Sequence, residues 1–316
     1  NVYFEKGLRY IQFHGKTNFS EGGQAHDVLH AIKKYGIVPE EVYTGLQYGR
    51  DFHIHAEMVE ALQGILDGVN KNPNRRITPV WTKGFMRYIE AYLGDTPETF
   101  TYEGKEYTPQ TFAKSLDLNL DDYVELTSFE AFPFYEAIVL PIPDNWLHGQ
   151  YYNLPIDELM EVMNNSLKNG YTVCWDGDVS HNGFSHSSGL AILPTDNPEE
   201  MINAEIDKWT SLSENERKNK MQSFESPVPE MKVNDAKRQF TFNNRQTTDD
   251  HLMHITGLLK DQNGTLYYKT KNSWGEERSQ FGGYLYMSEP FCRLQTVAIM
   301  VHKDAIPKAI RKKLGL

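Results

Sequence analysis

Two short stretches decide the fold: Thr248-Asp249-Asp250-His251 opens one apolar run, and Lys271-Asn272-Ser273-Trp274-Gly275 closes the next. The turn Gln262-Asn263-Gly264 between the two runs is typical of a hairpin connection. In an antiparallel hairpin, the start of the first strand and the end of the second strand are neighbours. We therefore expect His251 and Asn272 to lie side by side.

This pair has a chemical meaning. A side-chain amide next to an imidazole fixes the tautomer and orientation of the ring without adding a charge, which is the part of the third group in a nucleophile–base–orienter set. Trp274 is placed to shield the His251–Asn272 hydrogen bond from water. Alone, each residue is more often a buried hairpin histidine or a turn asparagine. The combination with Gly22-Gly23, which opens a helix, favours a catalytic site.

The first part of the chain is mostly helical by its hydrophobic periodicity. A helix that ends at Gly36, for example, carries Ala25, Val28, Leu29 and Ile32 at the spacing of one buried face. We expect helices over Asn1–His14, Ala25–Gly36, Asp51–Val69, Thr78–Leu93 and Thr108–Leu116, and a hairpin over Glu98–Tyr107.

The second part changes to short β-branched and aromatic runs. We expect strands over Ala137–Pro141, Tyr171–Trp175, Leu252–Leu259, Thr265–Thr270, Gly283–Met287 and Thr296–His302. Helices are expected over Pro155–Lys168, Asn197–Trp209 and Ser213–Met221, the last two on the surface. The fold class is therefore α+β, a helical lobe plus an antiparallel β lobe.

The composition excludes several classes of function. The net charge is −11, so the surface as a whole would repel nucleic acid. No apolar run approaches the roughly 18–20 residues that a membrane span needs. Two cysteines, Cys174 and Cys292, cannot build a disulfide scaffold.

In these blocks, the sequence resembles the papain-like cysteine peptidases. The stretches Thr248–Gly257, Tyr268–Gly275 and Gly283–Met287 are similar to the histidine, asparagine and following-strand blocks of that family. The double glycine and the segment Tyr35–Tyr43 are similar to the family's corresponding region. Within the family, Val173–Ser180 and the long interval before Gly170 resemble the bleomycin hydrolase and aminopeptidase C branch.

The resemblance implies a papain-like two-lobed cysteine peptidase fold with a large helical insertion. It implies that residues 1–45 are the remainder of the helical lobe with the Gly-Gly segment, and that residues 46–135 are the mainly helical insertion. Residues 136–316 would be the antiparallel β lobe that carries the histidine and the asparagine, with surface helices and a basic C-terminal tail.

The resemblance also implies residue roles. His251 would be the general base and acid, Asn272 its orienter, and Trp274 their cover. Gly22 and Gly23 would offer backbone hydrogen bonds to an extended peptide, which needs close approach without a Cβ.

Two neighbours of the histidine complete the expected substrate site. Asp250 and Leu252 flank His251, and Leu252 would help to wall the apolar pocket for the second residue from the scissile bond. No metal and no organic cofactor is implied.

The family's nucleophilic cysteine and oxyanion-hole glutamine lie upstream of the double glycine. We expect both to lie upstream of Asn1, on a catalytic segment retained after cleavage or supplied by another chain. We interpret Cys174 and Cys292 as small buried hydrophobic residues, not as nucleophiles.

Several other polar clusters are expected to be structural. We interpret His26 and His30 as packing residues, His53, His55 and Glu57 as a solvated helix face, and the basic segment His302–Leu316 as a solvated tail. His181 and His186 receive no role.

The sequence thus predicts a thiol-dependent peptidase, an aminopeptidase of the bleomycin hydrolase type that forms an acyl-enzyme on peptide substrates. The alternative is a non-catalytic pseudo-peptidase that binds peptides or acts as a scaffold. Family resemblance implies a cytoplasmic location, although export stays open because an export signal would lie upstream of Asn1. A homo-oligomer, the substrate preference and the choice between exopeptidase and endopeptidase also stay open.

Overall fold

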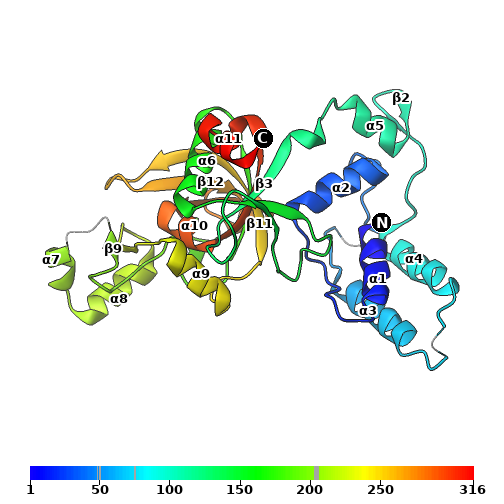
Figure 1. The fold of residues 1–316 in the computed structure, drawn as a ribbon, viewed down its shortest axis with the longest axis horizontal. Coiled ribbons are helices and arrows are strands. Elements are labelled where there is room, and N and C mark those ends of the chain that lie inside the picture. The colour runs from blue at the N-terminus through cyan, green and yellow to red at the C-terminus, as the bar shows by residue number, and fades with distance from the viewer. Residues whose placement is uncertain (48, 50, 75, 203–205) are drawn as a thin grey trace. The chain divides into compact units, whose positions relative to one another are not determined.

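The computed structural model describes residues 1–47, 49, 51–74, 76–202 and 206–316, which form two compact units (Figure 1). Unit 1 comprises Asn1–Leu120 and Pro141–Gly149, and unit 2 comprises Asp121–Leu140 and Gln150–Leu316. The expected division at residues 45 and 135 stays a prediction.

Unit 1 is built from helices, as the periodicity predicts. They are α1 (Val2–Gln12), α2 (Ala25–Tyr35), α3 (Ala56–Asn70), α4 (Val80–Leu93) and α5 (Pro109–Ser115), with the hairpin β1 (Phe100–Tyr102) and β2 (Lys105–Tyr107) before α5. The apolar faces of α3 and α4 form its core, in which Met58, Leu62, Leu66 and Phe85 are fully buried. Helix α3 begins at Ala56, five residues after the expected start at Asp51.

A carboxylate joins α1 to α2. Glu5 accepts hydrogen bonds from His30 at 2.9 Å, from Lys34 at 2.7 Å and from the Tyr35 hydroxyl. Burial alone would raise the pKa of Glu5, but these hydrogen bonds outweigh it and lower the pKa to about 2. The contact gives His30 a packing role. Val28, by contrast, is 59% exposed, although its spacing predicts a buried position.

Unit 2 is built on one sheet, which has ten strands among the described residues. Their order is β4-β5-β3-β14-β6-β11-β12-β13-β8-β7. The bounds are β3 (Tyr123–Thr127), β4 (Ala137–Val139), β5 (Gln150–Asn153), β6 (Val173–Gly177), β7 (Phe184–Ser185), β8 (Leu190–Ala191), β11 (His251–Lys260), β12 (Leu266–Lys271), β13 (Tyr284–Ser288) and β14 (Thr296–His302). Most neighbours are antiparallel, as expected, but β3–β5 and β13–β8 are parallel, so the sheet is mixed.

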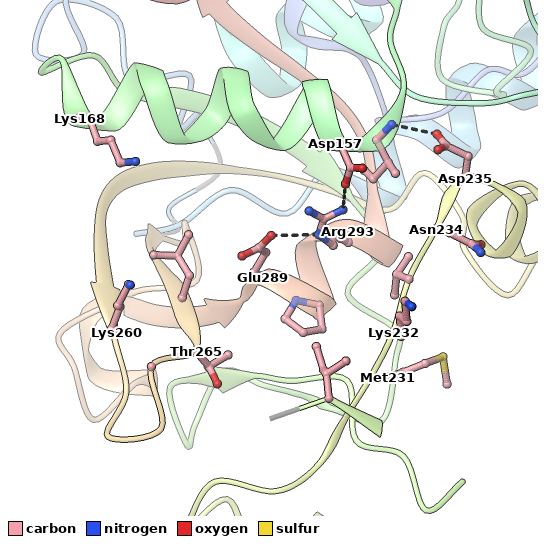
Figure 2. A pocket seen from close by; sticks show the side chains of 16 residues that line it. Asp157, Lys168, Met231, Lys232, Asn234, Asp235, Lys260, Thr265, Glu289 and Arg293 are labelled. Carbon is pink, nitrogen blue, oxygen red and sulfur yellow. Dashed lines mark hydrogen bonds and ion pairs between the residues drawn. The ribbon is translucent and has the colours of Figure 1, made fainter. Parts of the chain in front are cut away.

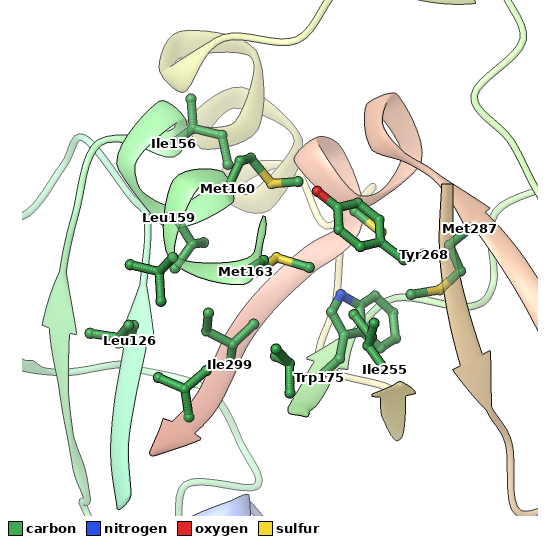
Figure 3. Packing of buried hydrophobic residues seen from close by; sticks show 14 of the residues in the cluster. Leu126, Ile156, Leu159, Met160, Met163, Trp175, Ile255, Tyr268, Met287 and Ile299 are labelled. Carbon is green, nitrogen blue, oxygen red and sulfur yellow. The ribbon is translucent and has the colours of Figure 1, made fainter. Parts of the chain in front are cut away.

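Three helices pack on this sheet and close its core: α6 (Ile156–Lys168), α10 (Glu289–Gln295) and α11 (Lys308–Leu314). Figure 3 shows Leu159 and Met163 of α6 above Trp175, Ile255 and Ile299 from three different strands. The indole of Trp175 donates to the Thr296 hydroxyl at 2.7 Å, which satisfies its buried N–H. This core holds the central strands β6, β11 and β12 in place.

The C-terminal segment differs from the expected solvated tail. It forms η3 (Lys303–Ala305) and helix α11, which buries Ile310 and Leu314 against the core. Several of its basic residues pair with acidic ones, for example Lys313 with Glu158 at 2.6 Å. The many Lys and Arg residues of this segment make the apolar spacing of its short helix difficult to recognise in the sequence.

A smaller group of elements completes unit 2. It comprises β9 (Met201–Ile202), α7 (Ile206–Thr210), α8 (Glu214–Ser223), β10 (Glu230–Met231) and α9 (Asp235–Asn243). The helix expected over Asn197–Trp209 is wrong at its start, where Met201–Ile202 is a strand paired with β10; residues 203–205 of that range lie outside the described residues. None of the described helices is long and apolar enough to cross a membrane.

Glu230 is a buried carboxyl in this part of the fold. Its side chain is 3% exposed and accepts hydrogen bonds from the Leu193 amide and the Ser288 hydroxyl. Burial raises the pKa of Glu230 to about 7, although the two hydrogen bonds oppose that shift. Because the folded-state pKa lies above the unfolded value, the fold loses stability as the pH rises through that interval.

The Glu230→Gln variant should remove this pH dependence, because glutamine keeps an oxygen acceptor and does not ionise. In urea unfolding followed by circular dichroism, we expect the unmodified chain to lose roughly 3 kcal/mol between about pH 4.3 and pH 7 from this group, and the variant to lack that loss. Exposed Glu225 supplies the control, and Glu225→Gln should retain the loss. Identical pH curves for the Glu230→Gln variant and the unmodified chain would refute the assignment.

Candidate active site

The candidate site lies at one end of the β11–β12 hairpin. His251 is the first residue of β11, and Asn272 directly follows β12. Their side chains meet at 2.8 Å, between His251 Nε2 and Asn272 Oδ1. The juxtaposition expected from the hairpin is confirmed.

A β-bulge sets the register of this end of the hairpin. The pairing shifts between Ile255 and Gly257, so that His254 faces Lys271. The β11–β12 pairing ends at this pair, three residues after His251 on β11 and one residue before Asn272 on the other side. Bulges are common next to active sites, and this one lies close to the His251–Asn272 contact along the hairpin.

The orientation of the Asn272 amide follows from a backbone contact. The N–H of Ser273, which can only donate, lies 2.7 Å from Asn272 Oδ1. That atom is therefore the amide oxygen, and His251 must donate to it through a protonated Nε2. Neutral His251 then carries its lone pair on Nδ1, which is the atom left to accept a proton.

Trp274 covers the pair as expected. Its ring centroid lies 5.0 Å from that of His251, with the two planes inclined by 33°. The indole is itself 39% exposed, whereas Asn272 is only 5% exposed. The arrangement keeps water from the amide but leaves the tryptophan at the surface.

The loop before His251 is anchored by a carboxylate that the sequence analysis did not single out. Asp178, 1% exposed, accepts from the Thr248 backbone N–H at 2.7 Å. Asp250, expected at the substrate site, is exposed and accepts from the Thr248 hydroxyl at 2.8 Å. Leu252 is half-buried beside the histidine. Asp178 stands in the quoted segment Val173–Ser180, but its partner is 70 residues away, so no local pattern identifies it.

A second imidazole lies on the other side of the amide. His186, which received no role from the sequence, is 8% exposed and places Nδ1 3.4 Å from Asn272 Nδ2. It belongs to the turn between β7 and β8, 86 residues before Asn272, so only the folded sheet brings the two together.

The double glycine lies in unit 1. A Cβ on Gly22 would come within 1.8 Å of the Asp144 carboxylate, and one on Gly23 within 2.7 Å of Asp27. The Gly22 carbonyl accepts from Lys6. A side chain at either position would therefore have to displace a carboxylate within unit 1.

The two cysteines differ in exposure: Cys292 is buried as expected, whereas Cys174 is only half-buried, because it lies on a strand whose residues alternate in burial at that end. Cys174 pairs with His254 across β6 and β11, whereas His251 pairs with Gly177, about 10 Å further along β6. Burial, with Asp176 and Glu125 nearby, raises the pKa of Cys174 to about 12. Cys292 is fully buried on α10, and burial raises its pKa well above the ordinary value. Both thiols are protonated at neutral pH.

One cavity of unit 2 lies away from the His251–Asn272 pair. A cavity of about 690 Å³ lies between α6, α10 and β12 (Figure 2), where Arg293 pairs with Asp157 at 2.6 Å and with Glu289 at 3.0 Å. Neither His251 nor Asn272 lines it. Across the described residues, no group of three or more His, Cys, Asp or Glu side chains is arranged to hold a metal ion.

Comparison with known proteins places the site in context. The family model of the Peptidase C1-like family matches residues 4–226 and 228–315. Aminopeptidase G of Lactobacillus delbrueckii subsp. lactis is 23% identical over 95% of this chain, and human bleomycin hydrolase is 25% identical over 96%. The chain covers 66% and 67% of those two relatives, so it spans about two thirds of their length.

The fold is also shared with a solved structure. PepW from Lactobacillus rhamnosis HN001 superposes with a TM-score of 0.67 at 19% identity, over 99% of this chain and 72% of that chain. The expected papain-like α+β fold is confirmed by this match and by the family match.

Both cysteines should resist thiol reagents in the native chain, because the reactive species is the thiolate and both thiols stay protonated. With a chromogenic disulfide reagent at pH 7.5, we expect slow labelling of the folded chain and rapid labelling of two thiols after unfolding in urea. Fast stoichiometric modification of Cys174 or Cys292 in the native chain would contradict this description of their surroundings.

Proposed function

Because this chain belongs to the Peptidase C1-like family, we propose that it forms the base-bearing part of a thiol-dependent aminopeptidase of the bleomycin hydrolase type. The observation that carries the proposal is the 2.8 Å hydrogen bond from His251 Nε2 to Asn272 Oδ1. It prepares an imidazole with a fixed ring plane and a free Nδ1, which is what a general base requires.

The proposed reaction uses Nδ1 of His251 four times. It accepts the proton of a cysteine thiol, and the thiolate attacks the scissile carbonyl. The imidazolium then protonates the departing amine as the tetrahedral intermediate collapses to a thioester. Next, His251 takes a proton from water, whose oxygen attacks the thioester. Finally, it returns that proton to the thiolate leaving group, which releases the acid product and restores the thiol. Throughout, Asn272 holds the ring by its Nε2–H.

We propose that the nucleophilic cysteine and the oxyanion-hole glutamine are supplied by residues outside these 316. Support comes from the two cysteines present, whose thiols stay protonated at neutral pH. Cys174 is also about 10 Å along β6 from Gly177, the residue that pairs with His251. The glutamine would donate a hydrogen bond to the oxyanion. Loss of one such donor lowers the rate roughly 10²–10³-fold in enzymes where one has been removed.

The proposed substrate is a peptide with a free amino terminus, on the strength of the relatives named aminopeptidase. Leu252, half-buried next to His251, suits the wall of an apolar subsite, and exposed Asp250 suits the rim. Backbone groups of Gly22 and Gly23 would pair with the extended peptide.

A second candidate function is a peptide-binding or scaffold protein without turnover. This alternative is favoured by the raised pKa of both cysteine thiols, because a protonated thiol is a poor nucleophile toward a carbonyl. The sequence encoded upstream of Asn1 discriminates between the two: a Gln…Cys-Trp block there supports the peptidase, and another residue at the cysteine position supports the scaffold.

The test uses the full gene product with whatever precedes Asn1, assayed on a fluorogenic aminoacyl amide. We expect thiol-dependent turnover, a loss of about 10³-fold or more in kcat for His251→Gln, and a smaller loss of about 10–100-fold for Asn272→Ala, because only orientation of the base is lost.

The conservative Asn272→Gln variant and the distant His302→Gln variant are the controls, with partial and full activity expected. Peptide binding without any turnover would favour the scaffold. Full activity of His251→Gln would eliminate the proposed base. Preference for an amino-terminally blocked peptide would indicate an endopeptidase.

A further inference from the structure

We propose that His186 is a positioning residue that locks the Asn272 carboxamide from the side opposite His251, so that the amide is held between two imidazoles. This inference deepens the proposed function, because its value to catalysis rests on His251 acting as the base. Neither the family match nor the names of the relatives assigns anything to His186.

The contacts of the Asn272 side-chain amide are compatible with one arrangement of donors and acceptors. Its oxygen faces two donors, the Ser273 backbone N–H at 2.7 Å and His251 Nε2 at 2.8 Å. Its nitrogen therefore faces His186 Nδ1 at 3.4 Å, at the long end of hydrogen bonding. Because an amide nitrogen only donates, this contact requires Nδ1 of His186 to accept. The proton of neutral His186 then lies on Nε2, which is buried and has no hydrogen-bond partner among the described residues.

These contacts assign the Nε2–H tautomer to both imidazoles, although the two rings use it differently. His251 uses its Nε2–H to bind the amide and keeps Nδ1 for the reaction. His186 uses its bare Nδ1 to bind the amide and takes no part in the reaction. Rotation of the amide by 180° would break the contacts with Ser273, His251 and His186 together. His186 thus raises the barrier to rotation of the Asn272 amide into an orientation that cannot accept from His251.

The surroundings of His186 keep it neutral. Its side chain is 8% exposed, and the Trp274 indole lies edge-on at 5.2 Å between ring centroids. Burial lowers the pKa of His186, the backbone of Gly275 opposes that shift, and the neighbouring His251 and Arg278 lower the pKa further. When His251 becomes an imidazolium during the reaction, its charge disfavours a second proton on His186, so the acceptor at Nδ1 persists.

A merely structural role would leave the chemistry of His251 unaffected. In that case any side chain of similar volume against Trp274 would serve. The positioning role instead requires an acceptor atom toward Asn272 Nδ2. His186→Phe keeps the ring and removes the acceptor, whereas His186→Gln keeps a carbonyl acceptor, so the two variants separate the two roles.

The experiment is long-range ¹H–¹⁵N NMR of the 316-residue chain, which reports the protonated nitrogen of each imidazole without any catalytic turnover. The His251 signals are assigned by their loss in His251→Gln, and those of His186 by their loss in His186→Phe. In the unmodified chain we expect Nε2–H on both rings. In His186→Phe the two His251 ¹⁵N shifts should move toward each other as the tautomers mix, and in His186→Gln they should stay close to their original values.

Unchanged His251 shifts in a folded His186→Phe variant would overturn the proposal. If that variant does not fold, the unmodified chain still decides, because an Nδ1–H tautomer of His186 cannot accept from Asn272 and would refute the inference on its own.

Turnover by the full gene product separates this inference from the proposed function. We expect kcat to fall about fivefold to tenfold in His186→Phe with KM little changed, a loss in keeping with one neutral hydrogen bond. If the tautomer shifts as expected but no version hydrolyses peptides, the peptidase proposal fails and the positioning of Asn272 stands. If the protein is a peptidase and His186→Phe changes neither tautomer nor kcat, the positioning role fails alone.

Discussion

The hydrogen bond between His251 Nε2 and Asn272 Oδ1 is the interaction on which the rest of this structure converges. Near this 2.8 Å contact lie a bulge in β11 and Asp178, which accepts from the Thr248 backbone in the loop before the histidine. The hairpin in turn is held by the core of unit 2, where α6 packs on β6 and β11. The His251–Asn272 contact thus lies next to a shift in strand register and a buried carboxylate, on a hairpin that packs in an apolar core.

In the proposed function, His251 is the base and neither cysteine of this chain is the nucleophile. Cys174 and Cys292 are held in environments that suppress the thiolate, since burial disfavours the charged form and acidic neighbours add to the effect. The environment of His251 is different: the ring is half-buried, oriented by an amide without charge, and covered on one face by an exposed indole. The two kinds of site show how burial and neighbouring groups can make one side chain inert and another ready for proton transfer.

Much of this could be predicted from the sequence because it is encoded locally. The hairpin turn, the two flanking runs and the polar residues at their ends lie within 28 residues, from Thr248 to Gly275, and their geometry follows from strand pairing. The existence of helices α1 to α6 could be predicted for the same reason, from local signals such as apolar spacing and, for α5, the cap at Thr108 with Pro109 in the first turn. The failures depend on distant contacts. Helix α11 is defined by Ile310 and Leu314 reaching a core assembled elsewhere, and strand β9 by pairing with β10. His186 meets Asn272 only because β13 lies between β12 and the short strand β8.

Asn272 presents its oxygen to Nε2 of His251, so the ring proton should lie on Nε2 and Nδ1 should be free to accept a proton. Neutron diffraction from a deuterium-exchanged crystal, at a pH where His251 is neutral, locates the hydrogen on the ring. We expect deuterium on Nε2, directed at Asn272 Oδ1, and none on Nδ1. Deuterium on Nδ1 with a bare Nε2, or an amide turned so that its nitrogen faces His251, would contradict it.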